Sequence, residues 1–145
     1  MKWLFVLVIL CVSIGFSQQA LSRDQIEEMA KKMLEECAKK EGASDDDVKS
    51  AIAHQPPKTK PEKCLHACMG ETLGLIQNKK PNVEASVELA KMAFGADDPK
   101  VEQSRKIAAA CAHMTADDRC EAAVQMYECS IDEAKKLGIE FKDLL

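Results

Sequence analysis

The stretch Lys63-Cys-Leu-His-Ala-Cys68 decides the fold, because it sets two cysteines three residues apart within a helical pattern. Four further cysteines lie at wider intervals beyond the first 20 residues. They are Cys37, Cys111, Cys120 and Cys129, and the intervals between the six cysteines are 26, 3, 42, 8 and 8 residues. An even number of cysteines in a short exported chain is typical of a disulfide framework, which here would have three bridges.

Helix geometry excludes some of the 15 ways to pair six cysteines. Cys64 and Cys68 lie one turn apart on one helix face, so their side chains run parallel and cannot join without strain. Cys120 and Cys129 lie on one predicted helix, about 13 Å apart along its axis and on opposite sides. Ten pairings remain once these two are removed, and the residues alone do not choose among them.

The first residues predict export. After a basic start, Trp3–Phe16 is a nearly unbroken apolar run that is too short to span a bilayer. We expect a signal peptide over residues 1–17, cleaved after Ser17, with cleavage after Ala20 as the alternative. The seventh cysteine, Cys11, leaves with this segment, which turns an odd count of cysteines into an even one.

The length of the mature chain, residues 18–145, predicts one small domain. The whole chain has 20 basic and 24 acidic residues, and the loss of Lys2 with the signal peptide gives a net charge of about −5. An acidic protein lacks the basic face that nucleic-acid binding needs, so we exclude nucleic acid as a partner. No other apolar run approaches the length of a membrane span, so we expect a secreted, extracellular protein without membrane insertion.

The hydrophobic periodicity is helical throughout, with no alternating β pattern. Capping residues and stop signals predict six helices, over residues 22–40, 44–54, 61–78, 82–94, 98–114 and 115–138. The last of these helices is apolar over more than half of its circumference, which places it at the centre of the molecule. The expected fold class is therefore all-α, a compact bundle of about six helices stapled by three disulfides.

The six-cysteine spacing resembles that of the insect odorant-binding protein family, the pheromone-binding and general odorant-binding group. The short intervals carry the resemblance: three residues between the second and third cysteines, and eight between the fifth and sixth. It extends over the segment from Cys37 to Cys129. The resemblance implies the pairs Cys37–Cys68, Cys64–Cys120 and Cys111–Cys129, and a bundle folded around an internal apolar cavity.

The same resemblance implies a secreted carrier, which binds small hydrophobic odorants or pheromones and transports them through aqueous extracellular fluid. Its partners would be the small apolar ligand and a sensory receptor, with the protein as a monomer or weak dimer. Two alternatives stay open: a carrier of the same fold for a non-olfactory ligand in saliva, haemolymph or reproductive fluid, and a secreted interaction protein with a solid core.

We expect the walls of the cavity to come from apolar side chains of the later helices, among which adaptable methionines are frequent. The candidate ligand-binding residues are Met69, Leu73, Ile76, Leu89, Met92, Phe94, Ile107, Ala108, Met114, Val124, Tyr127, Ile131 and Phe141. The tail, residues 139–145, is apolar enough to fold back as a lid or as part of the wall.

Catalytic and metal-binding patterns are not found in the sequence. A secreted helical phospholipase needs an Asp beside its catalytic His and a Gly-rich calcium loop, and neither His66 nor His113 has them. The spacing Cys64-x-His66-x-Cys68 could be taken for zinc ligands, but a secretory context favours oxidation of the cysteines. We therefore predict no enzymatic activity, cofactor or metal, and place both histidines at solvated outer or boundary positions.

Overall fold

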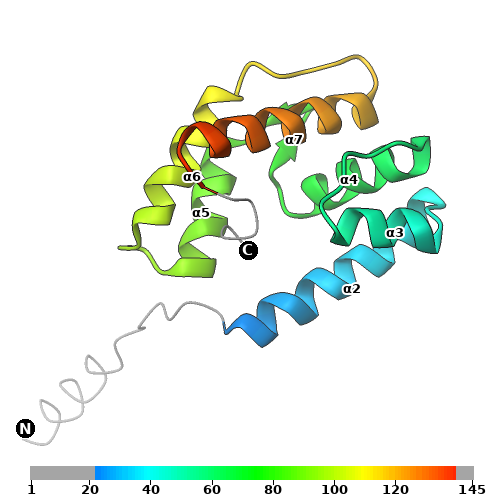
Figure 1. Cartoon of the computed structure of the whole chain (residues 1–145), viewed down its shortest axis with the longest axis horizontal. Coiled ribbons are helices and arrows are strands. Elements are labelled where there is room, and N and C mark those ends of the chain that lie inside the picture. The colour runs from blue at the N-terminus through cyan, green and yellow to red at the C-terminus, as the bar shows by residue number, and fades with distance from the viewer. Residues whose placement is uncertain (1–21, 140–145) are drawn as a thin grey trace, which may run out of the picture.

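The computed structural model describes residues 22–139 (Figure 1). The predicted signal peptide and the candidate wall residue Phe141 lie outside the described residues. The helices are α2 (Arg23–Glu41), α3 (Asp45–Ile52), α4 (Lys60–Thr72), α5 (Val83–Phe94), α6 (Pro99–Ala110) and α7 (Arg119–Lys136). The predicted all-α bundle is confirmed, and no helix among the described residues has an apolar stretch long enough to cross a membrane.

The helix starts follow the capping residues of the sequence. Ser22 accepts a hydrogen bond from the backbone N–H of Gln25, whose side chain accepts one from the backbone of Ser22. At the other end of α2, Gly42 has a φ of 68°, a left-handed conformation that suits glycine and ends the helix. The N-cap of α7 is Asp118, so this helix begins at Arg119 and not at residue 115 as predicted.

The predicted continuation of α4 to Asn78 is wrong. The helix ends at Thr72, and Gly74 turns the chain with a φ of 71°. A short antiparallel hairpin follows, in which β1 (Ile76–Gln77) pairs with β2 (Lys80–Pro81). Its two turn residues both have positive φ, as the tight turns of two-residue hairpins require. The sequence expectation of a chain without strands therefore fails at this one place.

Two other helices end earlier than expected. The helix α3 ends at Ile52, and His54 takes a φ of 52°, which a continued helix does not allow. The helix α6 ends at Ala110, with Cys111 as its C-cap, instead of reaching Met114. Pro56 and Pro57 follow the end of α3 within a few residues, whereas neither glycine nor proline marks the end of α6.

Three disulfides cross-link the helices. They are Cys37–Cys68, Cys64–Cys120 and Cys111–Cys129, with Cα–Cα distances of 5.7, 4.5 and 5.9 Å. These are the pairs that the family resemblance implied. The first joins α2 to α4, the second joins α4 to α7, and the third joins the end of α6 to α7.

Two clusters of buried apolar side chains are found among the described residues, and further buried apolar residues lie on α6 and α7. The first, between α2, α3 and α4, contains Leu34, Cys37, Ala51, Leu65 and Cys68. The second, between α5 and α6, contains Val87, Ala90 and Val101. Figure 1 shows α5 and α6 side by side at one end of the molecule and α2, α3 and α4 at the other, with α7 extending across both. Six side chains of α7 are buried, which agrees with the central position predicted for this helix.

Candidate functional site

The candidate wall residues are distributed over both apolar clusters. Met69 packs against the first cluster, and Phe94 packs against the second. Met92, two residues before Phe94 on α5, is 51% exposed although it is a large apolar side chain. The candidate wall residues therefore include members that pack against each of the two clusters.

The other wall candidates differ in burial. Ile107, Ala108 and Val124 are buried, and Leu73, Leu89 and Met114 are half-buried. Ile76 lies directly against the backbone of α4, because a Cβ added to Gly70 would be only 2.6 Å from the Cδ1 atom of Ile76.

Tyr127 and Ile131 lie in a hollow of about 290 Å³ on the surface of α7. We call this hollow the α7 groove; its lining residues are Pro56, Tyr127, Glu128, Ile131, Asp132 and Lys135. The apolar members come from α7 and from the loop between α3 and α4, and the charged members form a rim. Its volume is just below the range of about 300–1,000 Å³ that is usual for small-molecule sites.

A second hollow, of about 120 Å³, lies beside the Cys37–Cys68 disulfide on α2 and α4. Its lining includes Met33, Glu36, Lys40 and Thr72. The volume is well below the usual range of ligand pockets, so we do not consider it as a carrier site.

His66 lies behind Tyr127, on the face of α4 that meets α7. The two ring centroids are 4.8 Å apart, and the Tyr127 hydroxyl donates a hydrogen bond to the backbone carbonyl of His54 at 3.1 Å. Burial lowers the pKa of His66, and the nearby carboxylate of Glu62 opposes this effect. His66 is thus half-buried, a boundary position rather than a fully solvated one, whereas His113 is exposed as expected.

Glu62 is the most unusual side chain near this contact, since it is charged and only 2% exposed. One carboxylate oxygen, Oε2, accepts the backbone N–H of Lys58 at 2.7 Å. The other oxygen, Oε1, is enclosed, and so is the Nε2 atom of His66; neither has a hydrogen-bond partner within residues 22–139. The sequence contained a signal for this burial, because Glu62 precedes Leu65 by three residues and Met69 by seven, on the apolar stripe of α4.

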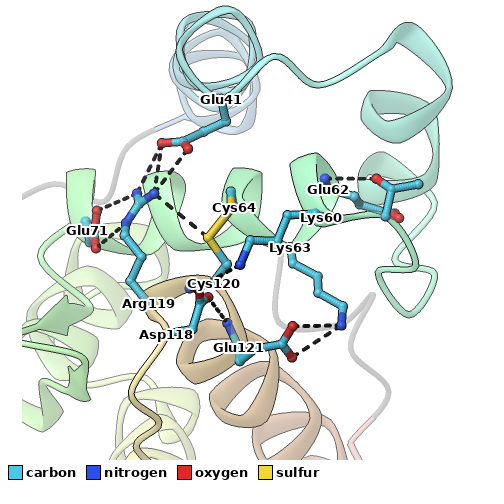
Figure 2. Close-up of a disulfide and its surroundings, with 11 residues drawn as sticks. Glu41, Lys60, Glu62, Lys63, Cys64, Glu71, Asp118, Arg119, Cys120 and Glu121 are labelled. Atoms are coloured by element: carbon cyan, nitrogen blue, oxygen red, sulfur yellow. Dashed lines mark hydrogen bonds and ion pairs between the residues drawn. A yellow bond between two sulfur atoms is a disulfide. The ribbon is translucent and has the colours of Figure 1, made fainter.

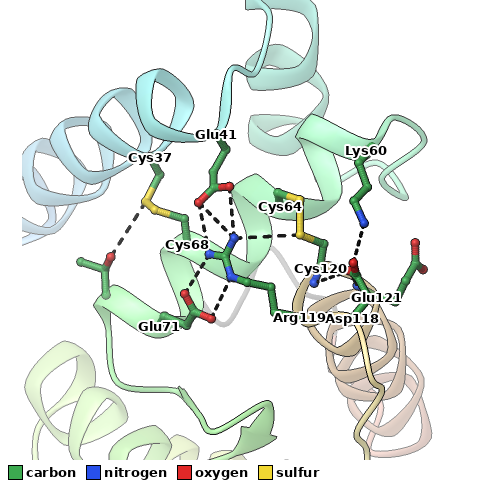
Figure 3. Close-up of polar contacts among 11 residues, drawn as sticks. Cys37, Glu41, Lys60, Cys64, Cys68, Glu71, Asp118, Arg119, Cys120 and Glu121 are labelled. Atoms are coloured by element: carbon green, nitrogen blue, oxygen red, sulfur yellow. Dashed lines mark hydrogen bonds and ion pairs between the residues drawn. A yellow bond between two sulfur atoms is a disulfide. The ribbon is translucent and has the colours of Figure 1, made fainter.

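Arg119 forms the largest polar network of the described region, which sequence reasoning missed. Its guanidinium donates hydrogen bonds to Glu41 of α2, at 3.1 Å to Oε2, and to Glu71 of α4, at 2.8 Å to Oε2. Figure 3 shows the guanidinium between the two carboxylates and between the disulfides Cys37–Cys68 and Cys64–Cys120. These hydrogen bonds raise the pKa of Arg119, and the bond from Arg119 lowers the pKa of Glu71. The network therefore joins the same three helices as the two disulfides.

Two lysine–carboxylate pairs flank the Cys64–Cys120 disulfide on its other side (Figure 2). Lys60 contacts Asp118 at 2.6 Å, and Lys63 contacts Glu121 at 2.9 Å. The hydrogen bond from Lys60, supported by backbone N–H groups at the start of α7, lowers the pKa of Asp118 to about 2. These pairs orient the start of α7 against α4.

Within the described part of the chain, no group of three or more His, Cys, Asp or Glu side chains is arranged to hold a metal ion. All six cysteines in that part are in disulfides, so none provides a thiolate.

Comparisons with known proteins agree on one family. The PBP/GOBP family model matches residues 19–133. The chain is 38% identical over 137 residues to general odorant-binding protein 28a of Drosophila melanogaster, covering 90% of this chain and 96% of that relative. The solved structure of odorant-binding protein dmelOBP28a from Drosophila melanogaster matches with a TM-score of 0.67 at 38% identity, covering 78% of this chain and 97% of that chain. A pheromone-binding protein of the cockroach Leucophaea maderae, solved with the fluorescent reporter ANS, is similar in fold, with a TM-score of 0.63, 19% identity, and coverage of 77% of this chain and 97% of that chain.

Proposed function

The chain belongs to the PBP/GOBP family, and on this premise we propose that it is a secreted carrier of small hydrophobic ligands, odorants or pheromones. The observation that carries the proposal is the family match over residues 19–133, together with helices held by three disulfides. A cross-linked helical shell keeps apolar side chains apart at a distance where a ligand can fill the space between them. Delivery to a sensory receptor stays a prediction.

We place the ligand between the two apolar clusters, against α7. A ligand in this position would cover apolar side chains of both clusters and remove them from water. Met69 on one side, Phe94 on the other and the exposed Met92 support this position. Micromolar binding corresponds to about 8 kcal/mol, which at about 25 cal/mol per Å² needs roughly 330 Å² of apolar surface removed from water. A small volatile ligand suffices for this.

The test is the binding of the neutral dye N-phenyl-1-naphthylamine to the mature protein and its displacement by medium-chain alcohols, esters and terpenoids. A dye is needed because Trp3 is the single tryptophan and lies in the predicted signal peptide. We expect micromolar affinity. Absence of binding by every apolar class would support the alternative of a solid-core interaction protein.

A matched pair of variants tests the position of the ligand. Met92→Asp introduces a charge at the proposed wall and is expected to weaken dye binding about tenfold or more, because a charge opposes the burial of apolar surface. Ile52→Asp is the control, since Ile52 is also exposed and apolar, at 61%, but lies at the end of α3. Equal affinities of the two variants would refute the proposed position.

A further inference from the structure

Two enclosed polar atoms of α4, Oε1 of Glu62 and Nε2 of His66, have no role in the proposed carrier function. Glu62 and His66 are one helical turn apart, so their side chains project from the same face of α4. That face meets Tyr127 of α7, whose ring contacts the His66 ring. The Glu62 carboxylate lies near enough to Tyr127 to contribute, after burial, to the raised pKa of its hydroxyl. The three side chains therefore form one cluster behind the α7 groove.

The unpaired atoms point to a missing hydrogen-bond partner. Buried polar side-chain atoms are paired in the great majority of native structures, and each exception needs a physical explanation. The Glu62 carboxylate is fixed through Oε2 by the backbone N–H of Lys58, which leaves Oε1 for another donor. No side chain within residues 22–139 supplies that donor, or a partner for His66 Nε2.

The chemistry of the two atoms selects a hydroxyl group. A carboxylate oxygen can only accept a hydrogen bond, so the partner of Glu62 must be a donor. The neutral imidazole of His66 either accepts or donates at Nε2, depending on its tautomer. A hydroxyl satisfies Glu62 by donating its hydrogen, and its oxygen can also accept from His66. An ether oxygen of the same size cannot donate to Glu62 at all.

We propose that the α7 groove and the Glu62–His66 pair behind Tyr127 form a second binding site, for a small hydroxyl-bearing apolar molecule. The Tyr127 ring separates this pair from the groove, so the ring turns when the molecule binds. The hydroxyl of the bound molecule then donates a hydrogen bond to Glu62 Oε1 beside His66. Its apolar part lies along the groove against Pro56 and Ile131. This site is separate from the carrier site between the two apolar clusters, and it adds a chemical preference that apolar walls do not provide.

The test compares 1-octanol with 1-methoxyheptane, an ether with the same number of heavy atoms that lacks the hydroxyl. Each compound is titrated into the full mature protein while the ring-proton NMR signals of His66 are followed, assigned by their loss in His66→Phe. We expect saturable shifts and an affinity for the alcohol about tenfold higher, which corresponds to about 1.4 kcal/mol. No movement of the His66 signals with the alcohol, or equal affinities for the two compounds, would overturn the proposal and mean that solvent alone occupies the site.

Variants separate this site from the carrier site. Glu62→Gln keeps an oxygen for the Lys58 N–H but removes the charged acceptor, and is expected to abolish most of the alcohol preference. Glu28→Gln is the matched control and should keep it, because Glu28 is an exposed glutamate of α2 outside the groove. Met92→Asp should weaken dye binding without changing the His66 titration. A preference for the alcohol that persists unchanged in Glu62→Gln also refutes the site, while the dye experiment tests the carrier function independently.

Discussion

Replacing Arg119 by glutamine is expected to lower the free energy of unfolding by about 2 kcal/mol. Five hydrogen bonds connect this guanidinium to the carboxylates of Glu41 and Glu71. Glutamine has a shorter, uncharged side chain that cannot reach both carboxylates. The change therefore removes the polar connection between α2, α4 and α7 while leaving all three disulfides intact.

The carboxylates of Glu41 and Glu71 contribute unequally to the expected decrease in the free energy of unfolding. The Glu41 side chain is 12% exposed, so without Arg119 it remains a poorly hydrated charge, a loss of about 1.5–2 kcal/mol. The Glu71 side chain is 37% exposed and regains water, so its pairing contributes only about 0.5 kcal/mol. The sum is close to 2 kcal/mol, most of it from Glu41.

Thermal unfolding of the oxidised protein, followed by far-UV circular dichroism, measures the effect. Unfolding entropy of about 2.1 cal/mol/K per residue gives roughly 0.25 kcal/mol/K for a domain of this size, so the expected decrease in Tm is about 8 °C. The control is Arg105→Gln, because Arg105 is 42% exposed and its ion pairs with Glu84 and Glu102 are both 3.6 Å long. We expect about 0.5 kcal/mol or less for the control.

A decrease in Tm for Arg119→Gln no larger than that for Arg105→Gln would refute the reasoning. A second comparison tests the assignment to Glu41. Adding Glu41→Gln to Arg119→Gln should restore part of the stability, since the double variant no longer contains an uncompensated buried charge. Further destabilisation in the double variant would show that Glu41 is stabilised by other groups.

Two further predictions concern α4 and its neighbours. The low pKa of Asp118, about 2 in the folded protein, means that its contribution to stability is present above its ordinary pKa of 3.8 and is lost as the pH falls toward 2. Lys60→Gln should flatten this part of the pH profile of urea midpoints, and an unchanged profile would contradict the assignment to Lys60. Gly70→Ala should lower stability by about 1 kcal/mol despite the better helix propensity of alanine, because its Cβ would overlap Ile76. Ile76→Ala in the same chain should reverse the sign, and a Gly70→Ala variant with raised Tm would exclude the overlap.

Local signals in the sequence sufficed for most of the helical framework. The caps Ser22, Asn82 and Asp118 act within their own turn, so the sequence near each helix start contains the information. The extension of α4 was wrong because Leu75 and Ile76 continue the helical spacing of apolar residues. The glycine at position 74, which ends the helix, was the contrary signal.

The polar contacts could not be predicted in the same way. Arg119 bonds to Glu41 and Glu71, which are 78 and 48 residues away, and no periodicity reports on such distances. The position of His66 against Tyr127 likewise depends on how α4 crosses α7. Only the position of Glu62 could be recognised from the sequence, because this charged residue lies on the apolar stripe of α4.

The two cysteines of α7 on opposite sides of one helix also limit how the molecule can move. Cys120 ties α7 to α4, and Cys129 ties it to the end of α6. Sliding either neighbour along α7 would stretch a covalent bond. α7 therefore fixes the register of both neighbours along its length, because one covalent bond holds each of them.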